Sequence, residues 1–154
     1  MNIFVVDKNP KIAAKMLCDK HVVKMIVETA QMLCTVARLR GHDAPYRATH
    51  KNHPCTKWAD KTKGNWDWLV EHGIEMCKEY TRRYNRRHKT QDVIEWCRDN
   101  HHIGPQFGCL TPFAQAVPDK YKTSNPVKAY RDYYIGEKSH IAKWKNSPPI
   151  WWPQ

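Results

Sequence analysis

The stretch from Cys18 to Leu39 reads CDKHVVKMIVETAQMLCTVARL, and its periodicity decides the fold. At about 3.6 residues per turn it predicts a helix with two stripes of different character. An apolar stripe, expected to face a core, consists of Val22, Met25, Ile26, Thr29, Leu33, Val36 and Ala37. A polar stripe consists of His21, Lys24, Glu28, Gln31 and Thr35. Because Glu28 is the single carboxylate of the polar stripe, among basic and amide groups, it is a candidate catalytic residue.

The rest of the chain continues the helical pattern and predicts a mainly α fold. Asn9 and Pro10 are typical of a helix cap and first turn, and Gly41 of a helix end. We expect a compact single-domain helical bundle over residues 1–154, with an extended N-terminus, long loops and an irregular tail at 146–154. The expected helical regions are 10–39 with a candidate break near Cys18 and Asp19, 55–84 with one near Gly64 and Asn65, 90–98 and 126–144.

The charge balance favours a polyanionic partner. The 26 Lys and Arg residues against 15 Asp and Glu give a formal net charge of +11. Nucleic acid is favoured over a membrane surface, because no strongly amphipathic basic terminal helix is present. No apolar run approaches the roughly 20 residues of a membrane span. The first residues lack the basic and apolar regions of a secretory signal, so the cytoplasm or nucleoid is the expected location.

The six cysteines form no CxxC pair, which argues against a zinc ribbon or a thioredoxin-type motif. Cys18, Cys34 and Cys77 lie inside helical patterns, so reduced thiols are expected. A metal site made by His50, His53 and Cys55 is conceivable, but its spacing matches no standard zinc pattern. We therefore expect neither a metal nor a cofactor.

Two polar segments suit a phosphate backbone. Four arginines near the end of the second helical region exceed what the helix dipole alone explains, and Tyr84 among them can stack on a base. A second segment precedes that region, where exposed backbone N–H groups can hold a phosphate or an extruded base, or where a side chain simply caps the helix. The residues are Arg82, Arg83, Arg86 and Arg87 in the first segment, and His50, Lys51, Asn52 and His53 in the second.

The seven tryptophans and seven tyrosines fall into two groups. Trp58, Trp66, Trp68 and Trp96 have helical spacing and are expected mostly in the core. A late group alternates with lysines and suits stacking on unpaired bases, or else the tail packs back over the core. This late group consists of Tyr130, Tyr133, Tyr134, Trp144, Trp151 and Trp152.

The order of several features resembles one family of DNA repair enzymes. These features are the run Cys18-Asp19-Lys20-His21 followed by Glu28, then Asn52-His53 before a long helix with Cys77 and a basic cluster, and finally Tyr133-Tyr134-Ile135-Gly136. Together they resemble the pyrimidine dimer DNA glycosylases of the endonuclease V type from phages and algal viruses. The similarity covers most of residues 1–90 and is weaker near 130–140.

The resemblance implies a helical domain that kinks duplex DNA and extrudes a base. It places Glu28 at the position of the family's catalytic glutamate and His21 at that of a histidine seven residues earlier. Glu28 then stabilises the sugar cation or helps to open the sugar ring. An N-terminal α-amine attacks C1′ to form a Schiff base, and β-elimination can then cleave the strand.

The sequence departs from the family pattern at two places. The family's amine belongs to a small residue that is exposed when methionine is removed, whereas Asn2 is bulky, so Met1 is expected to stay and to supply the amine. The family's arginines immediately before and three residues after the glutamate correspond to Val27 and Gln31. Lys20 and Lys24 are the candidates to replace them.

Three functions remain open from the sequence. The first is a monomeric N-glycosylase that flips a damaged or modified base, above all a pyrimidine, out of double-stranded DNA. The second is a non-enzymatic nucleic-acid-binding protein, and the third is an enzyme that acts on free or modified pyrimidine nucleotides. For the first, the catalytic candidates are Glu28, Met1 and His21, and the DNA-binding candidates are Lys20, Lys24, Gln31, His50, Lys51, Asn52, His53, Arg82, Arg83, Arg86 and Arg87.

Overall fold

Helices make up the whole regular structure of the computed structural model, which describes residues 1–154 and contains no strand. The mainly α class is therefore confirmed. None of the helices is long and apolar enough to cross a bilayer. The elements are α1 (Pro10–Met16), α2 (Asp19–Leu39), α3 (Pro54–Lys61), α4 (Lys63–Tyr84), α5 (Gln91–Asp99), the 3₁₀ turns η1 (His101–Ile103) and η2 (Asp119–Tyr121), and α6 (Pro126–Glu137).

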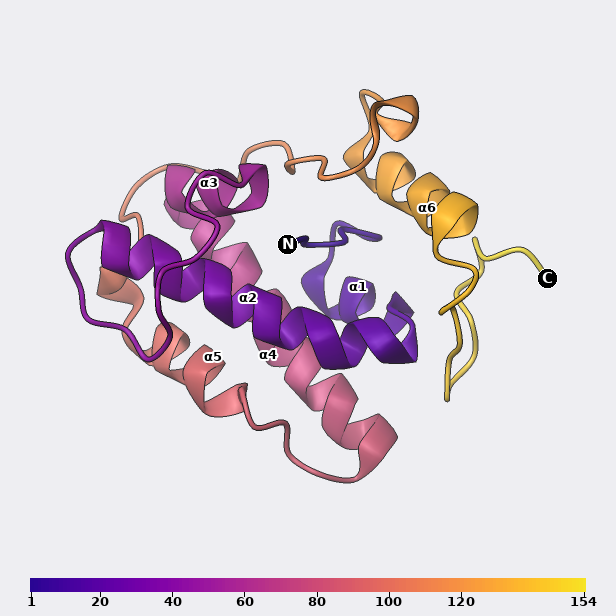
Figure 1. Cartoon of the computed structure of the whole chain (residues 1–154), viewed down its shortest axis with the longest axis horizontal. Coiled ribbons are helices and arrows are strands. Elements are labelled where there is room, and N and C mark those ends of the chain that lie inside the picture. Colours follow the sequence, from indigo (N-terminus) through magenta and orange to yellow (C-terminus); the bar gives the residue numbers. More distant parts are fainter.

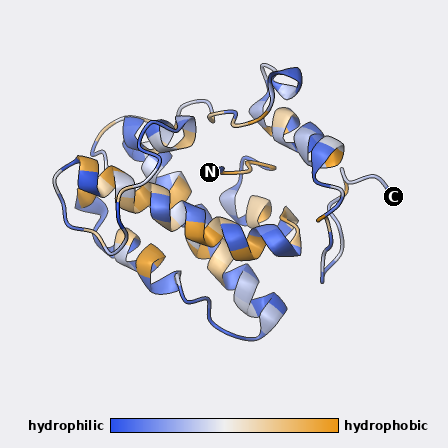
Figure 2. Ribbon diagram, in the orientation of Figure 1, coloured by the Kyte–Doolittle hydropathy of each residue, from blue (hydrophilic) through white to orange (hydrophobic).

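Helices α2 and α4 pack against each other at the centre of the molecule (Figure 1). Helices α3 and α5 pack against both of them, and α1 packs against α4. The predicted apolar stripe of α2 is buried along its whole length, with no member more than 3% exposed. Figure 2 shows its hydrophobic residues alternating with hydrophilic ones along the helix. The amphipathic pattern of this one helix therefore determines how the bundle is built around it.

The two expected helix breaks are present. Leu17 and Cys18 are extended and separate α1 from α2, as predicted. The second break lies at Thr62, slightly before the predicted Gly64 and Asn65. The Thr62 backbone is extended, and its hydroxyl accepts a hydrogen bond from the Asn65 N–H at 3.0 Å. Thr62 therefore ends α3 and caps α4 at the same time.

The prediction of a last helix from 126 to 144 is wrong at its C-terminal end, because α6 stops at Glu137. Beyond it the backbone bonds to other elements instead of continuing the helix. The Lys143 carbonyl accepts from the Asp19 N–H at 2.8 Å, and the Trp144 indole donates to the Met16 carbonyl at 2.9 Å. Tertiary contacts with the α1–α2 corner thus override the local helical propensity.

Of the two roles predicted for the late aromatic residues, packing over the core is the one that most of them have in the structure. The Trp151 indole reaches Met16 Sδ at 3.3 Å, and both Trp151 and Trp152 lie edge-on to the buried Tyr134 ring. Trp58, Trp66 and Trp68 are buried, as predicted for the early group. All six cysteines are free thiols, and all except Cys109 are buried.

The extended N-terminal segment is a structural layer of its own. Residues Asn2 to Val6 are all buried, and α6 packs against them (Figure 1). The Phe4 ring contacts three tyrosine rings of α6, and Arg131 of α6 donates to the Val6 carbonyl at 2.8 Å. The chain therefore begins in the interior, between α6 and the helical bundle, where its first amine faces the polar stripe of α2.

Candidate active site

The α-amine of Met1 and the carboxylate of Glu28 form an ion pair in the interior of the fold. The nitrogen lies 3.3 Å from Glu28 Oε1, and the side chains of the two residues are only 3% and 11% exposed. Glu28 comes from the middle of α2, whereas Met1 arrives from the segment under α6. The fold thus brings together two of the three predicted catalytic groups.

The cavity around this pair has a volume of about 180 Å³. Its wall includes Met1, Glu28, His21 and Lys24, together with Tyr133 of α6 and Lys138 directly after that helix. Lys24 Nζ lies 3.9 Å from Glu28 Oε2, and its side chain is 73% exposed. Two cations therefore face one carboxylate, which leaves the cavity rim with positive charge for a phosphate.

His21 is the third predicted catalytic residue, and it is held in one orientation. Its Nδ1 lies 2.7 Å from the Tyr134 hydroxyl, and the same hydroxyl oxygen accepts from the Cys18 N–H at 3.0 Å. The hydroxyl hydrogen of Tyr134 is free to point at Nδ1, and in that arrangement a neutral imidazole carries its own hydrogen on Nε2. The ring also stacks on Phe4 with centroids 4.3 Å apart.

The imidazole of His21 is neutral across the physiological range. Burial, and then the charges of Lys138 and Lys24, lower its pKa to about 3. A histidine with this pKa is not a general acid at neutral pH, but its Nε2–H remains a hydrogen-bond donor. The site therefore offers one amine, one carboxylate and one neutral donor.

The charges of both Met1 and Glu28 act on His53. Its pKa is lowered by burial first, then by the Met1 ammonium and His50, while Glu28 acts in the opposite direction. Its Nδ1 accepts from the Cys55 N–H at 3.1 Å and caps α3, so the capping role predicted as an alternative is confirmed. Burial raises the pKa of the neighbouring Cys55 to about 12, which keeps this thiol protonated and unsuited to nucleophilic attack.

The other α2 candidates lie along one outer face of the helix. Lys20 and Lys24 are exposed, and Gln31 is half-buried. Gln31 borders an open hollow of about 410 Å³ that also contains Arg47. Before α3, His50, Lys51 and Asn52 are exposed.

The arginines near the end of α4 are far less available than the sequence indicated. Arg82 pairs with Glu79, and Arg87 contacts both Asp92 and Glu95. The Arg83 side chain is 2% exposed and is bound by Glu79 and Asp19, so it is a structural residue and the prediction that it contacts phosphate does not carry over. Arg86 donates to the Tyr80 hydroxyl at 3.0 Å and has no carboxylate partner.

Several residues of the site were missed as candidates. Asn2, Phe4 and Lys138 line the cavity, and Lys138 Nζ lies 4.9 Å from the Tyr133 ring centre. Only the adjacent pair Tyr133-Tyr134 carried a signal in the sequence. The others are separated from Glu28 by too many residues for any periodic pattern to connect them.

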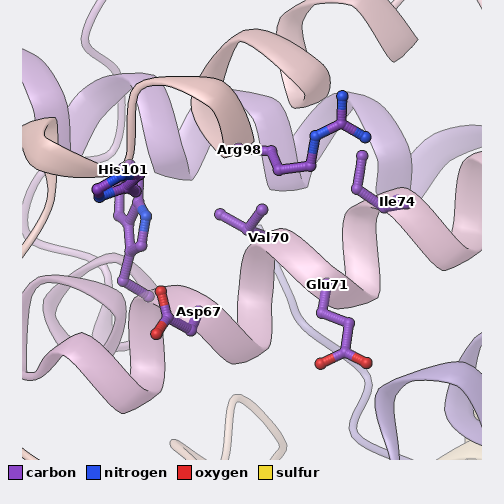
Figure 3. A pocket seen from close by; sticks show the side chains of 7 residues that line it. Asp67, Val70, Glu71, Ile74, Arg98 and His101 are labelled. Carbon is purple, nitrogen blue, oxygen red and sulfur yellow. The ribbon is translucent and has the colours of Figure 1, made fainter.

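A second hollow, of about 230 Å³, lies on α4 and α5 and is separate from this cavity (Figure 3). Its walls mix Val70 and Ile74 with Glu71 and Arg98, and none of the predicted site residues borders it. No group of three or more His, Cys, Asp or Glu side chains is arranged to hold a metal ion.

The ion pair of Met1 and Glu28 lies within the part of the chain that a comparison of sequences matches to a known family. The sequence model of the pyrimidine dimer DNA glycosylases matches residues 1–92. The chain belongs to this family. No curated protein and no solved structure gives a match. The family region contains Met1, His21 and Glu28, whereas Tyr133 of α6 and Lys138 directly after it, which line the other side of the cavity, lie outside this region.

Proposed function

We propose that this protein is a DNA N-glycosylase that removes a damaged or modified pyrimidine from duplex DNA and then cleaves the strand. The observation that carries the proposal is the Met1 amine 3.3 Å from Glu28 Oε1, in a cavity with a basic rim. Membership of the pyrimidine dimer DNA glycosylase family supports a repair glycosylase with lyase activity. The base is reached by flipping it out of the stack.

The amine–carboxylate pair can carry out base removal with every proton accounted for. The Met1 ammonium first releases a proton to solvent, and the neutral amine then attacks C1′. The C1′–N bond to the base breaks, and the base leaves with the electron pair and takes up a proton from solvent. Glu28 accepts a proton from the new secondary ammonium. It returns this proton to O4′ as the C1′–O4′ bond opens, which leaves a Schiff base between Met1 and C1′. Loss of a C2′ proton then expels the 3′-phosphate, and hydrolysis frees Met1.

His21 contributes a hydrogen bond rather than a proton in this scheme. Its neutral ring presents Nε2–H, while Tyr134 fixes Nδ1. A donor in this orientation can bind an oxygen of the extruded base or of the sugar. Because burial lowers the pKa of His21 to about 3, the ring stays neutral and keeps this role at neutral pH.

The DNA contacts that we propose surround this cavity. Lys20 and Lys24 of α2 and Lys51 before α3 are exposed cations suited to phosphates. Gln31 and His50 lie between them along the chain, Asn52 and His53 follow Lys51, and all four can add hydrogen bonds. Arg86, which has no carboxylate partner, can extend the contact at the end of α4. Arg82 and Arg87 are paired with carboxylates and contribute less, and Arg83 is excluded by its burial. We propose that the protein acts as a monomer on cytoplasmic or nucleoid DNA.

Glu28→Gln tests the proposal most directly. It keeps the size of the side chain and removes the proton acceptor, so base release should fall by about 10²–10⁴-fold while DNA affinity is retained. Nicking of ultraviolet-irradiated and unirradiated plasmid, scored with and without alkali, measures base release and strand cleavage separately. Borohydride trapping on an abasic duplex reports the Schiff base.

Glu71→Gln makes the same chemical change on α4, outside the cavity, and should leave both activities intact. A fully active Glu28→Gln enzyme would sink the proposal. Salt-sensitive DNA binding without base release from any damaged duplex would identify a binding protein instead. Turnover of mononucleotides with weak duplex binding would identify a nucleotide enzyme.

A further inference from the structure

The chain begins with a tight turn that is held by the side chain of Asn2. Asn2 Oδ1 accepts from the N–H groups of Ile3 at 2.7 Å and Phe4 at 2.9 Å. Its Nδ2 donates to the Ala116 carbonyl at 2.8 Å, and the residue is 8% exposed. Both polar ends of this one amide are therefore bound in the interior, and they tie the first four residues to a distant loop.

The backbone of the turn is strained. Phe4 has a φ of +38°, a region that residues with a side chain rarely adopt. Such conformations persist where surrounding contacts determine them, and they cluster at functional sites. Here the contacts are Asn2 Oδ1 on the Phe4 N–H and the stacking of the Phe4 ring on His21. The turn consequently sets the direction in which the residue before Asn2 enters the cavity.

Both the side chain and the α-amine of Met1 are held by the fold. Its side chain is 3% exposed and packs against the hydrophobic core, while its amine faces Glu28. If Met1 were removed, the new terminal nitrogen would belong to Asn2, about 3.8 Å further along the Cα trace. That nitrogen would be attached to a residue already fixed on Ala116.

We propose that Asn2 is the positioning residue of the nucleophilic amine. Its side-chain amide holds the turn that aims the Met1 nitrogen at Glu28. This role requires that Met1 stays on the chain, which the bulk of Asn2 already predicts. The catalytic part of this inference rests on the proposed glycosylase function. The retention of Met1 and the placement of its amine do not depend on that function.

The test compares three substitutions at Asn2 with a control at Asn9. Asn9 Oδ1 also accepts two backbone N–H groups, from Lys11 at 2.9 Å and Ile12 at 3.2 Å, but it holds α1 rather than the amine. Asn2→Leu keeps a bulky second residue and removes the acceptor. Asn2→Asp keeps the acceptor, and Asn2→Ala permits methionine removal. Asn9→Leu is the matched control.

Intact mass should show Met1 on the wild type, Asn2→Leu and Asn2→Asp, and its loss from Asn2→Ala. Borohydride trapping on an abasic duplex should be at least about tenfold slower in Asn2→Leu and Asn2→Ala. It should be largely rescued in Asn2→Asp and unchanged in Asn9→Leu. If Asn2→Leu does not fold, Asn2→Gln, which moves the amide by one methylene, should show the same loss in milder form. Wild-type rates in the folded Asn2 variants, or a wild-type protein without Met1, would overturn the inference.

The placement of the amine can also be tested without DNA. Reductive methylation with formaldehyde should modify the buried, paired amine of the wild type slowly, and about tenfold faster in Asn2→Leu but not in Asn9→Leu. If the wild type forms no adduct with any abasic duplex, the glycosylase proposal fails. The methylation rates still test whether Asn2 places the Met1 amine. Equal rates in wild type and Asn2→Leu would refute the role of Asn2 whatever the enzyme does.

Discussion

Two basic regions of this molecule, the cavity at the N-terminus and the end of α4, differ in how their charges are used. The end of α4 is the richer in the sequence, yet Arg82, Arg83 and Arg87 all have carboxylate partners. At the cavity, the Met1 amine and Lys24 share Glu28 alone. Charge density along a sequence is therefore a poor guide to positive potential. Neutralising carboxylates come from three or four residues away on the same helix, as Glu79 does for Arg82 and Arg83, or from the next helix, as Asp92 and Glu95 do for Arg87.

The largest effect that separates the two regions should come from Arg83→Met. Arg83 donates to Glu79 Oε1 at 2.9 Å, Asp19 Oδ1 at 3.1 Å and the Leu17 carbonyl at 2.8 Å. Its removal leaves the carboxylate of Glu79, itself 2% exposed, without its buried partner, which should cost about 3–5 kcal/mol of stability in denaturant unfolding. Arg87→Met, on a side chain that is 52% exposed, should change stability far less, because solvent screens its ion pairs. An Arg83→Met protein of normal stability with weakened DNA binding would make the end of α4 the DNA-contact surface.

The next effect is on the pH dependence of stability. The pKa of His21 is lowered to about 3, so between pH 6.5 and 3 the unfolded chain binds a proton that the folded chain does not. Stability from this group is complete above about pH 6.5 and is lost as the pH falls through that window, by roughly 2 kcal/mol at pH 5. His21→Gln should remove this part of the slope in urea titrations at pH 7 and pH 5.

His88, next to the end of α4, is the matched control. Burial lowers its pKa, but its hydrogen bond to the Val23 carbonyl acts in the opposite direction. His88→Gln should therefore flatten the pH dependence less than His21→Gln. Equal flattening by the two substitutions would show that the cavity's cations, Lys24 and Lys138, do not act on His21.

The sequence predicted the parts of this structure that depend on local order. The periodicity of α2 identified the buried stripe and placed Glu28, His21 and Lys24 together, because a helix fixes which residues share a face. The position of the Met1 amine beside Glu28 agrees with what the resemblance implies, and the retention of Met1 stays a prediction.

The features that the sequence did not predict depend on contacts between distant segments of the chain. The Asn2 bond to Ala116 and the Tyr134 bond to His21 each join residues more than 100 positions apart, and no pattern with a short period reveals them. The carboxylates that neutralise the arginines were visible in the sequence. Their effect depended on where the chain turns after Asn85, whose φ of +53° ends α4.

Lys24→Gln and Arg87→Gln should separate the regions by DNA affinity. In a Glu28→Gln background, where chemistry is blocked and Lys24 has lost its charged partner, Lys24→Gln should lower affinity several-fold and reduce the slope of log K against log salt by about 0.9. Arg87→Gln should change the slope little, because Asp92 and Glu95 already neutralise Arg87. Salt titrations by fluorescence anisotropy measure both. A larger change for Arg87→Gln would reverse the assignment of the two regions.

The smallest expected effect is an increase in DNA affinity. Gln31 occupies the position at which the resemblance implies an arginine, one helical turn after Glu28, and the hollow beside it has room for a longer side chain. Gln31→Arg should raise affinity for an abasic duplex a few-fold, because the added cation lies on the same face of α2 as Lys24 and Glu28. Thr81→Arg adds the same charge at an exposed position of α4, next to the paired Arg82. If the two variants gain affinity equally, total charge governs binding and the distinction between the regions has no consequence for DNA. A gain for Gln31→Arg alone places the duplex across α2 at the mouth of the cavity.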